Sequence, residues 1–319
     1  MTKLHDIKKE ILAKADAGEI TPQQAVQEFE RRVMPGRTYQ PKDKNERLKQ
    51  YATDKELRLR ARQSSVPFIS AEFNGLFKLS QGLVLVGGVS GQGKSTTAAN
   101  IVAGFLANSD DKKKAIVITN EETSEAVINR VACIQLGYSF FELQKGRMLA
   151  DKLNEVEDQA KLLTDRVIVE AGDSVYEMNY VEDVIGALEY AAAERNVGLI
   201  MLDYFQTVNA SRENPEDSPY SVLKRLGFYL KEYGRKAPVP VVCFAQLKNK
   251  SEEQHFKERV EGDRTIYNHA FTCVEIVPDF KTCITKFIVH KDRFGFGQGK
   301  EIEMEYVDGR YQPVGGGSI

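Results

Sequence analysis

The sequence predicts an α/β fold, with a mostly parallel β-sheet flanked by helices and an antiparallel edge near the C-terminus. From about residue 66, short apolar runs alternate with helical segments, which is typical of parallel sheets covered on both faces. Near the C-terminus, apolar runs follow one another without helices, which favours antiparallel pairing. We expect a helical N-terminal arm over residues 1–64 and a main domain over residues 65–319.

The composition is that of a globular protein with a large core. The chain has 319 residues, 42% of them hydrophobic, and a net charge of −2. These values exclude a chain disordered throughout. No run approaches the roughly 20 apolar residues that a membrane-spanning helix needs, and the N-terminus lacks the apolar segment of a secretory signal. The four cysteines form no C-x-x-C pair and predict free thiols. We therefore expect a cytoplasmic protein that does not contact a membrane.

The arm is basic and the rest of the chain is acidic. Residues 1–64 carry 15 Lys and Arg against 10 Asp and Glu, a net of +5, so the remainder carries −7 to give the total of −2. One helix is predicted by apolar residues at helical spacing and by a glycine at its end, namely Leu4, Ile7, Ile11, Ala15 and Gly18. A capping box of Thr21 and Gln24 predicts a second helix that ends near Met34.

A linker at Arg37–Lys42 leads to Asp43–Gln63, which is strongly charged and has few apolar residues. Two interpretations of Asp43–Gln63 remain open: a solvated helix, or a helix that docks on a neighbouring subunit. The arm is too short and too polar for a strong core of its own. We expect its deletion to weaken assembly and leave a folded main domain.

The main domain is predicted to contain five strands before its C-terminal part, at Leu83–Gly87, Ala115–Thr119, Arg166–Glu170, Gly198–Leu202 and Val239–Phe244. The predicted helices are Ser95–Ala107, Ser124–Leu136, Leu149–Leu163, Tyr180–Arg195 and Ser221–Tyr233. Three further strands are predicted at Val274–Val277, Cys283–His290 and Glu301–Tyr306. The order of these elements agrees with the α/β prediction.

The sharpest motif is Gly88–Ser95, which matches G-x-x-x-x-G-K-[ST] at every fixed position between a strand and a helix. That context argues against a chance glycine-rich turn. In such a loop, main-chain amides and the helix N-terminus face phosphate oxygens, a lysine reaches the terminal phosphates and a hydroxyl contacts Mg²⁺. We expect ATP to contact Gly88, Ser90, Gly91, Gln92, Gly93, Lys94, Ser95 and Thr96.

Acidic residues follow two of the predicted strands. The apolar run that ends at Asp203 is typical of a Walker B strand, in which Asp203 would hold Mg²⁺ together with Ser95. Alone, it is equally consistent with a strand that ends in a polar residue. Glu121 and Glu122 follow another strand, and one of them is expected to orient the attacking water. Spacing does not separate these two acids, and either also suits the start of a helix.

Gln246, at the end of the strand Val239–Phe244, is placed to sense the γ-phosphate. The following loop, Lys248–Arg264, mixes basic and acidic residues. Such a loop is usually solvated surface. Its basic residues are alternatively suited to grip the phosphates of nucleic acid, and the candidates are Lys248, Lys250, Arg259 and Arg264.

Taken together and in order, residues 66–310 resemble the ATPase domain of DnaB-like replicative helicases, which are ring-forming motors with a RecA-like fold. Thr119–Glu125 resembles the family's S-L-E-M-P-x-E, Gly198–Gln206 its L-I-x-I-D-Y-L-Q, Ala245–Lys250 its S-Q-L-N-R, Thr265–Phe271 its S-I-E-Q-D-A-D and Lys291–Gly295 its K-x-R-x-G. Arg130 also falls where the family has an arginine.

This resemblance implies a RecA-like P-loop ATPase of a short phage or plasmid type. It implies that Glu121 is the catalytic acid, and that Lys291 and Arg293 reach the ATP of a neighbouring subunit. The implied assembly is a hexamer on single-stranded DNA, with a primase or helicase loader as a further partner. The chain departs from the family pattern at Asn120, and at Tyr267, His269 and Phe271, which replace acids.

Two rival functions remain open on the sequence. One is a RecA/RadA-like recombinase that coats DNA as a filament. A head-to-tail interface forms a closed ring or an open filament depending on the rotation between subunits, and this rotation cannot be calculated from the sequence. The other is a regulatory ATPase that assembles without unwinding DNA.

Overall fold

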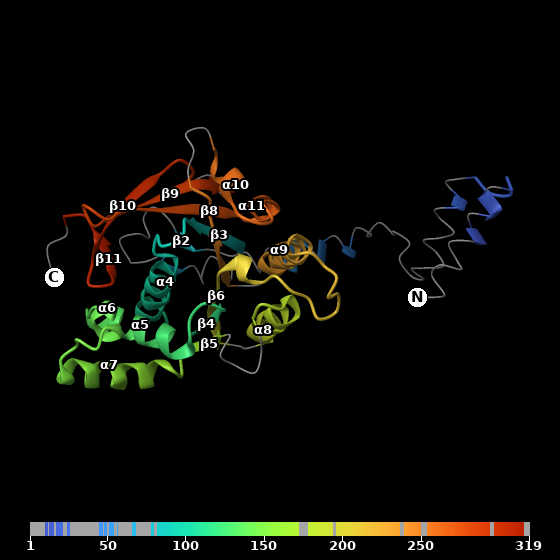
Figure 1. Ribbon diagram of the computed structural model, residues 1–319. Helices are drawn as coiled ribbons and strands as arrows, with labels where there is room; N and C mark the ends of the chain where they lie inside the picture. Colours follow the sequence, from blue (N-terminus) through green and yellow to red (C-terminus); the bar gives the residue numbers. More distant parts are fainter. Residues whose placement is uncertain are drawn as a thin grey trace. The chain divides into compact units, whose positions relative to one another are not determined.

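A computed structural model describes residues 10–11, 13–15, 17–21, 24–25, 45–46, 48–49, 51–53, 56, 66–67, 78–79, 82–171, 178–193, 196–236, 239–249, 254–293 and 297–315 (Figure 1). The chain divides into two compact units, Met1–Lys55 and Glu56–Ile319. This division falls after residue 55, whereas the sequence suggested a boundary after residue 64.

Most of the described residues of the first unit are helical, and residues 17–21 form a turn between helical segments. Thr21 N donates to Gln24 Oε1 (2.9 Å) and Gln24 N donates to Thr21 Oγ1 (3.3 Å), so the predicted capping box is present. Ile11 is buried, and Gly18 has the left-handed φ of 73° expected at a helix end. In the helical turns around Leu48 and Tyr51, these two side chains are 55% and 61% exposed. Leu4, Ile7, Met34 and the linker Arg37–Lys42 lie outside the described residues.

The second unit is built on a nine-stranded sheet with the order β11-β10-β9-β8-β3-β7-β6-β4-β5. Its strands are β3 (Gly82–Gly88), β4 (Lys114–Thr119), β5 (Val167–Ala171), β6 (Val197–Asp203), β7 (Pro240–Gln246), β8 (Thr272–Asp279), β9 (Ile284–Asp292), β10 (Glu301–Val307) and β11 (Arg310–Pro313). A separate pair joins β1 (Val66–Pro67) to β2 (Lys78–Leu79). β3, β6 and β7 are buried along nearly their whole length, as strands covered on both faces must be.

Helices cover both faces of the sheet, and each face has its own apolar core (Figure 1). The helices on one face are α4 (Lys94–Asn108), α5 (Ser124–Leu136), α6 (Phe140–Gln144) and α7 (Ala150–Leu163). Those on the other face are α8 (Val181–Ala193), α9 (Pro219–Lys236), α10 (Phe256–Arg259) and α11 (Thr265–His269). A short turn of 3₁₀-helix, η2 (Phe205–Thr207), follows β6.

The predicted antiparallel C-terminal edge is confirmed, because β8, β9, β10 and β11 pair antiparallel in sequence order. β8 pairs with β3 in parallel, with Val84 opposite Thr272 and Gly87 opposite Glu275. Only β9, β10 and β11 extend the sheet in antiparallel fashion. β8 runs parallel to β3 because the segment that contains the short helix α11 returns the chain to the level of the start of β3 before β8 begins. A helix of five residues gives only a weak pattern in the sequence.

The expected free thiols are present. Cys133, Cys243 and Cys273 are buried and unbridged, and Cys283 is exposed and unbridged. Among the described helices, none combines the length and the apolar character that crossing a bilayer requires.

Candidate nucleotide-binding and catalytic site

The phosphate loop lies between the end of β3 and the start of α4. Gly91 and Gly93 have left-handed φ values of 76° and 80°, which side-chain-bearing residues rarely adopt. Gly93 caps α4 without any side-chain hydrogen bond, so the first amides of the helix remain open to a ligand. Gln92 closes the loop on itself, because its Oε1 accepts from Val89 N (2.9 Å). The loop is therefore shaped to bind phosphate.

Lys94 points back over this loop. Its Nζ donates to Gly88 O (3.4 Å) and to Gln246 Oε1 (3.2 Å), and the side chain is largely buried. Burial lowers the pKa of Lys94 below its usual value, and the nearby Asp203 and Glu121 carboxylates partly oppose that shift. The ammonium group is thus held beside the loop by weak partners that a phosphate oxygen can replace.

Asp203 lies at the carboxyl end of β6 and is only 3% exposed. Burial raises its pKa to about 6, against the opposing hydrogen bond from Ser95. Its Oδ1 is buried and has no hydrogen-bond partner. An orphaned carboxylate oxygen beside a hydroxyl fits Mg²⁺, which takes oxygen ligands and completes its shell with water and nucleotide phosphates. Among the described residues, no three or more His, Cys, Asp or Glu side chains are arranged to hold a metal ion by themselves.

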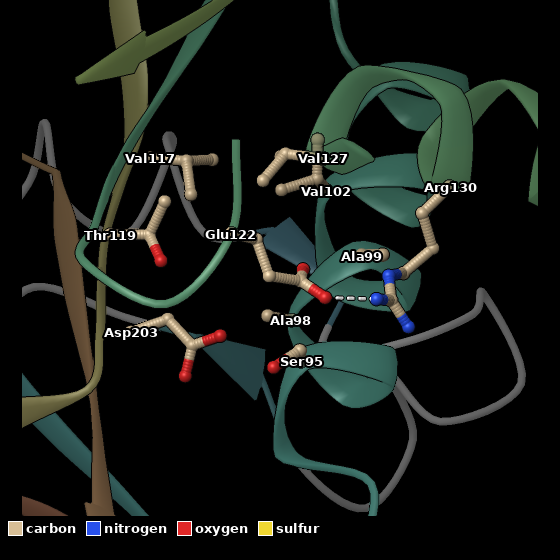
Figure 2. A pocket seen from close by; sticks show the side chains of 10 residues that line it. All are labelled: Ser95, Ala98, Ala99, Val102, Val117, Thr119, Glu122, Val127, Arg130 and Asp203. Atoms are coloured by element: carbon tan, nitrogen blue, oxygen red, sulfur yellow. Dashed lines mark hydrogen bonds and ion pairs between the residues drawn. The ribbon is translucent and has the colours of Figure 1, made fainter. Parts of the chain in front are cut away.

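The structure separates the two acids that the sequence left equivalent. Glu122 forms an ion pair with Arg130, which also donates to Thr96 Oγ1 (3.5 Å) and lies 4.4 Å from the centre of the Phe140 ring. Figure 2 shows Glu122 in a small cavity between Asp203 and Arg130, with Ser95 below it. The Glu122 carboxylate is therefore already held in an ion pair with Arg130 of the same chain.

Glu121 has different neighbours. Its pKa is raised chiefly by burial, and the charge of Lys94 and a hydrogen bond from Tyr204 act in the opposite direction. A carboxylate with a raised pKa close to the phosphate-binding lysine suits a group that accepts a proton from water. We therefore expect Glu121, rather than the ion-paired Glu122, to be the water-orienting acid.

Gln206, which sequence reasoning missed, ties the ends of two strands together. Its Nε2 donates to Gln246 O (3.2 Å) and Glu261 O (2.8 Å), and its Oε1 accepts from Gln246 N (3.0 Å). The side chain thus connects the segment after β6 to the end of β7 and to the loop beyond it. The only signal in the sequence was its place in the family-like segment Gly198–Gln206.

The loop after β7 begins as a short hairpin. Leu247 pairs with Val260, and Lys248 N donates to Arg259 O (2.7 Å). Lys248 and Arg264 are exposed, as DNA contacts require. Lys250 lies outside the described residues.

The expected DNA contact by Arg259 does not agree with its position. Its side chain is only 3% exposed, and its Nη1 lies 2.5 Å from Glu275 Oε1. Glu275 in turn contacts His290 Nε2 at 2.7 Å. The sequence suggested a phosphate contact, but Arg259 instead joins the hairpin to β8 and has no surface to offer to DNA.

Lys291 and Arg293 lie near the amino-terminal end of β3, whereas the phosphate loop follows the carboxyl end of this strand. Arg293 N donates to Phe271 O (2.9 Å), and Phe271 N donates to Leu83 O (2.7 Å), so Arg293 is level with the start of β3. The phosphate loop follows the end of the same strand, five residues later, or roughly 17 Å away along the strand. Lys94, Ser95, Glu121, Asp203 and Gln246 come together in one place, and Lys291 and Arg293 lie elsewhere.

Residues 68–263 match the family described as "DnaB-like helicase C terminal domain". The chain belongs to this family. One relative, the "Probable plasmid replicative DNA helicase" of Chlamydia trachomatis serovar L2, is 24% identical over 143 residues, which are 45% of this chain and 30% of that protein. The "Replicative DNA helicase DnaB" of Mycoplasma pneumoniae is 23% identical over 189 residues, which are 57% of this chain and 38% of that protein. The matched part of the chain thus spans less than half the length of these relatives.

Solved structures share the fold. One is described as "The Structure Of A DnaB-Like Replicative Helicase And Its Interactions With Primase"; it has a TM-score of 0.63 at 15% identity and covers 98% of this chain and 76% of its own. A second, the structure of an isolated ATPase domain, has a TM-score of 0.65 at 13% identity and covers 86% of this chain and 99% of its own. These likenesses confirm the RecA-like α/β fold that the sequence predicted.

Proposed function

We propose that this chain is an ATP-dependent DNA helicase motor that moves along single-stranded DNA as a ring during DNA replication. The observation that supports this proposal most is that the expected catalytic residues lie at opposite ends of the strands of one sheet. Lys94, Asp203 and Glu121 form one half-site, and Arg293 with Lys291 forms the other. Two copies of the chain, packed head to tail, would bring the two halves together.

In this proposal, the open amides of the phosphate loop bind the phosphates of ATP and Lys94 lies against the terminal ones. Ser95 and Asp203 would hold Mg²⁺, which when bound neutralises charge that develops on the phosphates. Glu121 orients a water molecule for in-line attack and accepts its proton. Arg293 from the neighbouring subunit stabilises the transferring phosphoryl group, and Lys291 supports it.

Gln246 links this chemistry to DNA. It contacts Lys94 on one side and begins the hairpin that carries Lys248 on the other. Loss of the γ-phosphate would change the partners of Lys94 and Gln246 and shift the hairpin. Lys248, Lys250 and Arg264 would then move a bound strand. Such contacts read no sequence and should weaken as salt increases.

We further propose a cytoplasmic homohexamer that works with a primase or a helicase loader. The pairing of half-sites requires a closed head-to-tail assembly or a filament, and family membership favours the ring. The exposed helical turns around Leu48 and Tyr51 supply an apolar surface that would help to hold neighbouring copies together.

Strand displacement on a forked DNA duplex tests this proposal. The wild-type chain should release the displaced strand only with ATP and Mg²⁺, and Lys94→Ala should release none. An ATPase that turns over normally and displaces no strand would instead support a regulatory role. Continuous filaments on single-stranded DNA, seen by negative-stain microscopy, would support the recombinase.

A further inference from the structure

The side chains of Lys291 and Arg293 lie against aromatic rings. Lys291 Nζ is 4.8 Å from the centre of the Tyr267 ring, and the guanidinium carbon of Arg293 is 4.8 Å from the centre of the Phe271 ring. Both distances are within the range of a cation–π interaction. Each cation therefore has a ring of its own, and both rings come from the short segment Tyr267–Phe271.

The main chain of the same segment completes both contacts. Lys291 Nζ donates to Tyr267 O (2.6 Å) and Asn268 O (3.3 Å), and Arg293 Nη2 donates to Asn268 O (2.8 Å). These carbonyls lie in the last turn of α11, where Lys and Arg side chains can hydrogen-bond the final carbonyls of a helix. Both cations thus contact the same carbonyl oxygen, that of Asn268, and each also lies over a different aromatic ring.

The surroundings of this pair are mostly positive. Burial lowers the pKa of Lys291, and the charges of Arg293 and Lys257 lower it further. Burial also lowers the pKa of His269, and Lys231 is the largest of the cations that add to this shift. The rings are therefore attractive partners in a place where the cations repel each other.

The Phe271 ring is firmly seated. A Cβ atom at Gly82 would lie 2.8 Å from the ring, so only glycine leaves room for it there. Tyr267 packs against Phe256, with ring centres 5.9 Å apart. Both rings are thus held by the body of the domain, which fixes the cations that rest on them.

Aromatic partners have a consequence that acidic partners would not have. A carboxylate would neutralise a guanidinium and occupy its forked N–H donors. A ring face attracts the cation and leaves donors at its edge free for another acceptor. In the resembling family segment, acids stand at the positions of Tyr267 and Phe271, whereas this chain has uncharged rings there.

We propose that Phe271 and Tyr267 are positioning residues that hold Arg293 and Lys291 ready to engage the phosphates bound by a neighbouring subunit. This inference rests on the proposed function, because it assumes that Arg293 acts on another subunit's ATP. Its specific content is that the π face of Phe271, and not merely its bulk, sets the rate of hydrolysis.

Replacement of Phe271 by a ring-fluorinated phenylalanine in the full chain tests this directly, because fluorination weakens the negative face of the ring and nearly preserves its shape. We expect kcat for ATP to fall by about two- to fivefold, and KM for ATP to stay unchanged. The kcat of Phe271→Leu should fall at least as far, and Phe271→Tyr should keep the wild-type kcat, because a tyrosine ring also offers a π face. The matched control is the same fluorination at Phe141, whose ring faces Lys145 at 5.6 Å on another helix and should have no effect.

Arg293→Ala, measured alongside, separates the two proposals. If it hydrolyses ATP as the wild type does, the trans-acting role of Arg293 fails, and the positioning role fails with it. If Arg293→Ala is inactive and the fluorinated Phe271 chain keeps the wild-type kcat, only the positioning role is overturned. In the background of Arg293→Ala, fluorination of Phe271 should cause no further loss, because the group that it positions is gone.

Discussion

Lys94 and Gln246 are joined across the candidate site by a hydrogen bond of 3.2 Å from Nζ to Oε1. One residue belongs to the phosphate loop and the other ends β7, from which the basic hairpin begins. Gln206 fixes the main chain of Gln246 through two further hydrogen bonds. The contact therefore connects the group that meets phosphate with the segment proposed to meet DNA.

Truncation of the two partners should have different consequences. Lys94→Ala removes the cation over the phosphates and should lower ATP turnover by about 10²–10³ or more, with the fold intact. Gln246→Ala should retain ATP binding and basal turnover to within about tenfold, yet lose the stimulation of turnover by single-stranded DNA. Steady-state ATPase assays with and without DNA measure both effects. Normal stimulation in Gln246→Ala would show that the hairpin is coupled to the site by another route.

The two adjacent acids should also behave differently. Glu121→Gln should bind ATP and lose about 10²–10⁴ in turnover, because the amide does not accept a proton from water. Glu122→Gln should retain most of the activity, because the amide oxygen can still accept from Arg130. Single-turnover hydrolysis compares them. A reversed order of the two losses would assign the water-orienting role to Glu122.

Two basic residues of the same hairpin should separate stability from DNA binding. Lys248→Ala should weaken single-stranded DNA binding and reduce the slope of its salt dependence by about one, with the melting temperature unchanged. Arg259→Ala leaves the buried Glu275 without its cation and should destabilise the domain by about 3–5 kcal/mol. Fluorescence anisotropy at several salt concentrations and urea unfolding measure the two quantities. A stable Arg259→Ala domain with weakened DNA binding would restore Arg259 to the DNA-contacting set.

The stability of the domain should depend on pH through Glu182. Burial raises the pKa of Glu182, but hydrogen bonds from Ser211, the Arg212 amide and Arg225 outweigh it and lower the pKa to about 2. Because the folded pKa lies below the ordinary value of 4.5, the ionised group stabilises the fold above about pH 4.5 and loses that effect as pH falls towards 2.

Glu182→Gln should therefore lower the free energy of unfolding by about 1–2 kcal/mol at pH 7, and by progressively less below pH 4.5. Urea unfolding across this range measures the difference from wild type. Glu189→Gln, on the same helix, serves as a matched control for the loss of one negative charge. A difference that stays constant from pH 7 to pH 3 would contradict the ionic origin of the effect.

The sequence predicted the fold well where local signals are strong. Long apolar strands and the glycine-rich motif placed the parallel sheet and the phosphate loop, because burial on both faces and left-handed glycines leave clear patterns. It did not predict the parallel pairing of β8 with β3, since strand direction here depends on the short connection through α11. Residues on different strands meet only after folding, and no spacing along the chain reveals such a meeting.

The candidate site shows the same division. The residue types and the order of Lys94, Asp203 and Gln246 along the chain were enough to predict their places. The expectation that Glu121 rather than Glu122 orients water depends on the contact between Glu122 and Arg130, which lies eight residues further along the chain in α5. The misassignment of Arg259 has a similar cause, because a basic residue in a mixed-charge loop looks the same in sequence whether its partner is a phosphate or the buried Glu275.

Hydrolysis of each ATP between two copies of the chain is the central claim, and ATP turnover by Arg293→Ala tests it most directly. Arg293→Ala should bind ATP as tightly as wild type, and its turnover should fall by about 10³–10⁵. Mixed with Lys94→Ala subunits, it should regain some activity at interfaces that pair an intact loop with an intact arginine. Turnover by Arg293→Ala close to that of wild type would contradict the claim.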